Sequence, residues 1–186
     1  MVARHRSEHQ ALLARWIAAG LLAPLAILAH EAGHALVATL RGCALVVLHW
    51  AATSIASCSN AGEALQLAAG PLASWLLVAA GWLANRGRLR PEGVIVAVCA
   101  SGRALYAIDA LVTTSSGTDE EHLAHVLDVP VAALVVPQVV LAVVVFAWAV
   151  RLVRRHDAGR DALAGIASAA AVAALYLFVV GPKLLP

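Results

Sequence analysis

Charged residues are scarce in this sequence. Only 13% of its 186 residues are Asp, Glu, Lys or Arg, whereas soluble domains average about 25%. The hydrophobic content of 62% and the mean hydropathy of +0.84 exceed what a soluble core of this length buries. The net charge of +2 is too small to indicate a nucleic-acid partner. Composition therefore disfavours a soluble domain and favours a membrane protein.

Cysteine is also rare. Cys43, Cys58 and Cys99 are odd in number and lack the CxxC spacing that is typical of thiolate zinc sites. The sequence therefore predicts neither a disulfide framework nor a cysteine-ligated metal ion. A pair between Cys43 and Cys58 stays open as an alternative, if their loop faces an oxidising compartment.

Long apolar segments make up most of the chain. A helix needs about 20 apolar residues to cross a hydrocarbon core of about 30 Å. Five segments satisfy this length, at roughly 16–40, 64–84, 94–113, 130–150 and 162–181. The sequence therefore predicts an all-α polytopic membrane protein with about five transmembrane helices, folded as a single domain over 1–186.

Residues 41–61, between the first two spans, do not resemble a helix. This stretch mixes β-branched and aromatic residues with polar ones, which indicates a short strand or hairpin. Because irregular backbone is not tolerated against lipid, we expect it to pack on the helices or to line a wet cavity.

Most of the basic residues fall on one side of this series of spans, and Arg41 and Lys183 are the ones left on the outer side. The larger group precedes the first span and fills the second-to-third and fourth-to-fifth loops, as Arg4, Arg6, Arg15, Arg86, Arg88, Arg90, Arg151, Arg154, Arg155 and Arg160. The third-to-fourth loop is acidic instead. The positive-inside rule then predicts a multi-pass protein of the cell membrane, with a cytoplasmic N-terminus and an extracytoplasmic C-terminus.

The first span contains an HExxH motif, His30-Glu31-Ala32-Gly33-His34. Residues four apart share a helix face, so His30 and His34 can bind one metal ion, and Glu31 lies beside them. With 8 histidines in the chain, chance placement gives about 0.01 such matches. Burying an ionisable side chain inside a membrane span costs free energy, so its presence there indicates a functional site. The motif predicts a Zn²⁺ site in which Glu31 activates zinc-bound water as a general base.

A catalytic zinc ion usually has three protein ligands, so two histidines leave the site incomplete. Asp119 is the first candidate, because the charge pattern places it on the outer side, toward which the HExxH motif also lies. Asp109, inside the third predicted span, is a second candidate. His122 and His125 are a third, since neutral imidazole is a common metal ligand.

Two other polar residues interrupt the apolar spans. Arg103 lies six residues before Asp109, which places the two on different helix faces. Arg103 can therefore snorkel, pair with another helix or stabilise an oxyanion, and the sequence does not decide among these. Gln138 follows Pro137, and we expect it to satisfy a helix kink rather than to bind substrate.

Three motifs in order carry a resemblance to a known family. The HExxH motif is followed by Ala69-Gly70-Pro71-Leu72-Ala73 in the next span and by Gly117-Thr118-Asp119 further on. Over roughly residues 25–125 this order resembles the site-2-protease (M50) class of membrane metallopeptidases, and most of all its compact, M50B-like bacterial branch.

The resemblance implies a hydrolase that cuts peptide bonds within or beside a membrane. It implies His30, His34 and Asp119 as zinc ligands and Glu31 as the catalytic acid and base. The region 43–58 then corresponds to a hairpin that presents the substrate as an added strand. Two departures stand out: Ser74 replaces a frequent asparagine, and Asp119-Glu120 replaces the usual Asp-Gly.

The sequence therefore predicts an intramembrane zinc-dependent endopeptidase. Its expected partners are the lipid bilayer and a membrane protein or peptide substrate, with no nucleic acid. One alternative is a metal-binding membrane transporter or sensor without catalysis, whose function survives Glu31→Gln. Another is a scaffold that binds no stoichiometric metal, although such a protein has no need of Glu31 beside both histidines.

Overall fold

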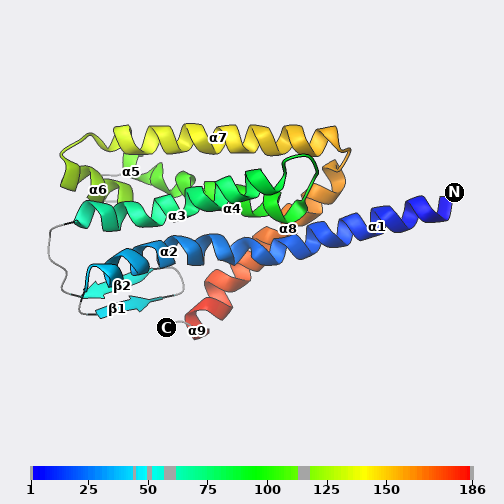
Figure 1. The fold of residues 1–186 in the computed structure, drawn as a ribbon. Coiled ribbons are helices and arrows are strands. Elements are labelled where there is room, and N and C mark those ends of the chain that lie inside the picture. Colours follow the sequence, from blue (N-terminus) through cyan, green and yellow to red (C-terminus); the bar gives the residue numbers. More distant parts are fainter. Residues whose placement is uncertain (1, 44, 50–51, 57–61, 113–117, 185–186) are drawn as a thin grey trace.

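The computed structural model describes the chain except for residues 1, 44, 50–51, 57–61, 113–117 and 185–186, so that Cys58 lies outside it. Figure 1 shows a bundle of long helices with one small hairpin. The elements in chain order are α1 (Val2–Ala19), the 3₁₀ turn η1 (Gly20–Leu22), α2 (Ala23–Leu40), β1 (Leu45–Leu48), β2 (Thr53–Ala56), α3 (Glu63–Ala84), α4 (Pro91–Ala107), α5 (Asp109–Val112), α6 (Asp119–Leu127), α7 (Val131–Arg155), α8 (Gly159–Leu175), the π-helical turn η2 (Tyr176–Val180) and α9 (Gly181–Leu184).

Four of the described helical segments are long and apolar enough to cross a membrane. They are Gln10–Leu40, Glu63–Ala84, Val131–Arg155 and Gly159–Leu184. They match four of the five spans predicted from the sequence. The predicted span at 94–113 corresponds to α4, which has 17 residues and ends at Ala107 before the short α5 begins. The chain thus has the architecture of an all-α membrane protein, while the fifth span stays a prediction.

The distribution of apolar residues is that of a protein packed in lipid. Alanines fill the interior, and Ala38 and Ala97 are completely buried. Large aliphatic and aromatic side chains face outward, including Leu40 at 77% exposure and Phe178 at 80%. A protein in water buries large apolar residues, whereas membrane helices pack through small ones. The outward surface therefore suits hydrocarbon.

The first long segment joins α1 to α2 through η1. Pro24 lies in the first turn of α2, where its missing N–H would have no helical partner in any case. Trp16, completely buried, anchors α1 against α4 and α8. The segment can therefore run in one direction through the bundle despite the break in its hydrogen-bond ladder (Figure 1).

Helix α3 lies beside α2, and their crossing depends on a glycine. A Cβ atom added at Gly33 would collide with the backbone carbonyl of Ala69. Helix α4 packs against α3 and α7, and α6 lies between α3 and α7 at the end of the bundle remote from the N-terminus (Figure 1). The second half of α2, the start of α3 and α6 thus meet at one end of the molecule.

The hairpin lies at this same end. β1 and β2 pair antiparallel, with Leu45 opposite Ala56 and Leu48 opposite Thr53. Both strands contact α2. The strand or hairpin predicted within 41–61 is therefore present, and it packs on a helix as expected for irregular backbone in a membrane protein.

Candidate metal centre

The two histidines of the HExxH motif share one face of α2, one turn apart. Their Nε2 atoms lie 3.3 Å apart, and their rings meet edge to face at 76°. Both side chains are buried, with 2% of His30 and 7% of His34 exposed. The helical spacing therefore brings two imidazole nitrogens to one point inside the protein, as the sequence predicts.

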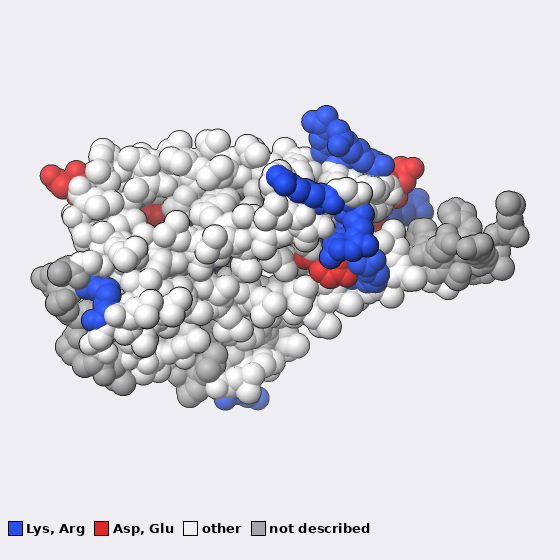
Figure 2. All heavy atoms as spheres, in the orientation of Figure 1, with Lys and Arg blue, Asp and Glu red and all other residues white. Residues whose placement is uncertain are grey.

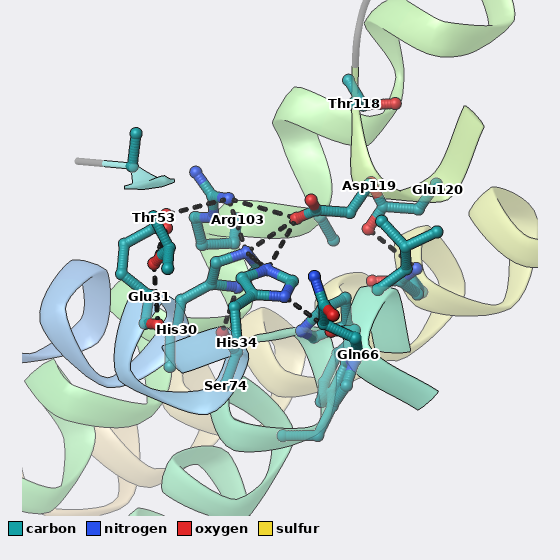
Figure 3. A pocket seen from close by; sticks show the side chains of 17 residues that line it. His30, Glu31, His34, Thr53, Gln66, Ser74, Arg103, Thr118, Asp119 and Glu120 are labelled. Atoms are coloured by element: carbon teal, nitrogen blue, oxygen red, sulfur yellow. Dashed lines mark hydrogen bonds and ion pairs between the residues drawn. The ribbon is translucent and has the colours of Figure 1, made fainter. Parts of the chain in front are cut away.

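Asp119 completes a group of three. It begins α6, and its Oδ2 atom lies 2.9 Å from His30 Nε2 and 3.2 Å from His34 Nε2. The side chain of Thr118 caps this helix by accepting a hydrogen bond from the backbone N–H of Glu121. Figure 3 shows the three side chains pointing toward one another from two helices.

The spacing of these three atoms suits a metal ion. A tetrahedral zinc site with bonds of about 2.0–2.1 Å places neighbouring ligand atoms about 3.3 Å apart. The observed separations are 2.9, 3.2 and 3.3 Å. Two imidazoles and one carboxylate form a donor set that zinc prefers. Among the described residues, this is the one group of His, Cys, Asp and Glu that could hold a metal ion.

The other ring nitrogens fix how the histidines face the site. His34 Nδ1 lies 2.7 Å from the carbonyl oxygen of Gln66, which can only accept, so this nitrogen carries a proton. His30 Nδ1 lies 3.1 Å from Ser74 Oγ. Helix α3 thus orients both rings, and an imidazole whose proton lies on Nδ1 presents the lone pair of its Nε2 atom to the centre. Such outer hydrogen bonds raise the affinity of metal sites.

The carboxyl of Asp119 is held in its ionised form. Burial raises its pKa, but the contacts of its carboxylate with His30 and His34 lower the pKa by more, so it lies well below its ordinary value. Asp119 is therefore an anion at neutral pH. An anionic carboxylate facing two lone-pair nitrogens is an arrangement that a cation stabilises.

Glycine at position 70 makes room for the two rings. A Cβ atom added there would collide with His34 Nε2 and would lie 2.7 Å from His30 Nε2. Gln66, Gly70 and Ser74 follow one another at intervals of four, so they share one face of α3. This face fits against the histidines, which explains the glycine of the Gly-Pro motif.

Replacement of Gly70 by alanine is therefore expected to displace the imidazoles. We expect zinc affinity, measured by competition with a chromophoric chelator, to fall by about 10–100-fold, as it does when support for a metal ligand is lost. Gly102→Ala is the matched control, because a Cβ atom at Gly102 has nothing within 4 Å. Equal zinc affinity of the two variants would contradict the proposed packing.

Glu31 lies in the same cavity as the three candidate ligands. Its side chain is buried at 5% exposure, and its Oε2 atom accepts a hydrogen bond of 3.1 Å from Thr53 Oγ1 on the hairpin. Its Oε1 atom lies 4.0 Å from Arg103 Nη2. The carboxylate is thus held between β2 and α4, and it is not one of the three groups, His30, His34 and Asp119, whose ligand atoms converge.

Arg103 reaches from α4 into the centre of the site. Its Nη2 atom lies 2.7 Å from His30 Nε2 and 3.9 Å from Asp119 Oδ2. A guanidinium can only donate, so His30 Nε2 accepts this hydrogen bond and its proton lies on Nδ1. Of the three interpretations that the sequence allowed, pairing with residues of other helices is the one observed; snorkelling is not.

The candidate site is a cavity of about 380 Å³ lined by α2, β2, α3, α4, α6 and α7. On its α7 side, the amide of Gln138 donates to Glu120 Oε1 at 3.1 Å and to the carbonyl of Leu134 at 3.3 Å. Gln138 therefore bonds to the backbone of its own helix next to Pro137, and it also lines the site. A smaller cavity of about 190 Å³ adjoins there, lined mainly by apolar residues of α3, α6 and α7.

The remaining candidate ligands fall elsewhere. His122 and His125 lie on exposed positions of α6, outside the three-residue group. The backbone of Asp109 starts α5, but its side chain lies outside the described part of the chain.

Sequence reasoning missed the roles of Thr53, Gln66 and Ser74. The spacing of Gln66 and Ser74 around Gly70 was a signal for two of them, because polar residues on one face of an apolar helix need partners.

Comparisons with protein-family models, curated proteins and solved structures find no match for this chain. Its function is therefore inferred from its own residues and their arrangement.

Proposed function

We propose that the chain is an intramembrane zinc-dependent endopeptidase. The observation that carries this proposal is that His30 Nε2, His34 Nε2 and Asp119 Oδ2 converge in a buried cavity that also contains the carboxylate of Glu31. A site that only stores or senses a metal has no need of an extra buried carboxylate beside the ligands. The helices around it are apolar outward, which favours a substrate that is itself a membrane protein or peptide.

The chemistry follows from what each group can do. When bound, zinc supplies a Lewis acid that polarises a carbonyl and lowers the pKa of water. Glu31 accepts the proton from the attacking water and returns it to the leaving amine. The hydrogen bond from Thr53 and the charge of Arg103 keep the Glu31 carboxylate in one position for both transfers.

Arg103 is the donor best placed to stabilise negative charge on the substrate. Its guanidinium lies within 4.0 Å of both Glu31 and Asp119 and is 29% exposed, so part of it faces the cavity. The carbonyl oxygen of a scissile peptide becomes anionic in the transition state, and a fixed donor in a buried site stabilises it strongly. We assign this role to Arg103, in agreement with one of the alternatives from the sequence.

The substrate is expected to bind in an extended form. A helical segment shields its peptide bonds, so it must unwind locally before cleavage, and pairing with the edge of the hairpin holds it open. Thr53 links this hairpin to Glu31. The apolar cavity beside Pro71, Trp75 and Leu134 then accepts a side chain next to the scissile bond.

The proposed orientation places this site toward the outer face of the cell membrane. The site lies at the end of the bundle formed by α6 and the hairpin, whereas the arginines of α7 and of the α3–α4 loop lie at the other end (Figures 1 and 2). The positive-inside rule assigns the arginine-rich end to the cytoplasm.

Removal of the metal tests the proposal. In detergent, cleavage of a fluorogenic transmembrane peptide is expected to stop after treatment with a zinc chelator and to return with one equivalent of zinc. Magnesium is the control and should not restore it, because two imidazoles suit zinc and not a hard cation. Full cleavage by protein shown to be free of metal would refute a metallopeptidase.

A further inference from the structure

Another cavity, separate from the two at the candidate site, lies at the end of the bundle remote from the candidate metal centre. It has a volume of about 340 Å³ and forms where the α3–α4 loop meets the end of α7. Its lining includes Arg86, Arg88 and Arg155, together with Trp82 and Trp148. Figure 2 shows Lys and Arg side chains gathered over this end of the molecule.

Among the described residues, no acidic one lines this cavity. Glu92, in the first turn of α4, is engaged by Arg15 at 3.0 Å, and Asp157 follows α7 without lining the cavity. Within the described part of the chain, none of the three lining arginines forms an ion pair. The helix dipoles place about half a negative charge at the C-terminal end of α3 and of α7. The three arginines carry three full positive charges, which is more. The cavity therefore attracts an anion.

The loop that carries two of these arginines is braced. The side chain of Asn85, which is 6% exposed, donates to the carbonyl of Gly81 at 2.8 Å and accepts from the backbone N–H of Arg90 at 2.8 Å. Arg86 stacks on Trp82, with Cζ 4.3 Å from the ring centroid. The loop is thus fixed beside the cavity by the Asn85 hydrogen bonds, and the Arg86 guanidinium is held there by its stack on Trp82.

The two tryptophans indicate the depth of this cavity in a membrane. Tryptophan is enriched at the level of lipid headgroups, and apolar helices extend from this cavity toward the other end of the bundle. Basic cavities between membrane helices at this level bind anionic headgroups. We propose that the cavity binds the phosphodiester of an anionic phospholipid, with the arginines around the phosphate and Trp82 and Trp148 against the acyl chains.

This proposal is tested by native mass spectrometry of the full chain in detergent. Palmitoyl-oleoyl phosphatidylglycerol is expected to bind more tightly than the phosphatidylcholine with the same acyl chains, by about tenfold or more. In the variant Arg86→Gln with Arg155→Gln, phosphatidylglycerol affinity should fall about thirtyfold, and phosphatidylcholine affinity should stay unchanged.

The matched control is Arg151→Gln with Arg160→Gln, which removes the same charge at exposed positions outside the cavity. It should change lipid affinity by less than about twofold. An equal loss in both double variants would mean diffuse attraction and overturn the site. Equal binding of the two lipids, or displacement of phosphatidylglycerol by an equal concentration of glycerol 1-phosphate, would overturn the assignment to an anionic lipid.

Discussion

Replacement of Glu31 by glutamine is expected to reduce peptide cleavage by about 10²–10⁴-fold while zinc content stays at one ion per chain. The amide has the shape of the carboxylate and can still accept the hydrogen bond from Thr53, but it cannot take a proton from water. Glu31 is not among the three converging ligand atoms, so the metal should remain. Cleavage and zinc content are measured on the same detergent-purified sample.

Glu63→Gln is the matched control, because Glu63 lies exposed in the first turn of α3, outside the candidate site. It should cleave like the parent protein. Undiminished cleavage by Glu31→Gln would refute the proposed mechanism. Metal-dependent transport or signalling that survives in Glu31→Gln would instead support the interpretation as a transporter or sensor without catalysis.

Loss of one candidate ligand is expected to abolish zinc binding at micromolar protein. His34→Ala and Asp119→Ala each remove one of three donor atoms that lie 2.9–3.3 Å apart. Two donors leave the ion with too few protein bonds. Zinc affinity should therefore fall by more than about 100-fold, which is the largest loss expected when only a hydrogen bond to a metal ligand is removed. Zinc per chain, measured by mass spectrometry of digested protein, reports this directly.

His122→Ala is the control for these variants, because His122 lies on the same short helix as Asp119 at an exposed position. It should retain one zinc ion per chain. If His34→Ala lost zinc while Asp119→Ala kept it, Asp119 would not be a ligand, and the third ligand would be assigned to Asp109 or His122.

Helical periodicity was enough to predict how His30 and His34 meet, because both lie on one helix. The convergence of Asp119 with them followed from charge, since the acidic loop and the HExxH motif lie toward the same side of the predicted membrane. The hairpin was predictable from β-branched residues in a stretch too polar to span. These features depend on local sequence or on a single global rule.

Contacts between side chains of different helices could not be predicted from the sequence. Spacing relates Arg103 to residues of its own helix, but its partners His30, Glu31 and Asp119 lie on other elements. Hydropathy likewise cannot distinguish a helix buried in protein from one that faces lipid. Helix α4 is apolar because it packs among other helices. An isoleucine such as the buried Ile95 contributes the same hydropathy whether it contacts protein or lipid.

X-ray absorption at the zinc edge reports which protein atoms bind the metal ion. The purified parent protein is expected to show zinc bound by nitrogen and oxygen atoms at about 2.0–2.2 Å, with scattering from two imidazole rings and none from sulfur. That result fits His30, His34 and Asp119. Sulfur at about 2.3 Å, fewer than two imidazoles, or no zinc in metal-replete protein would contradict the proposed centre.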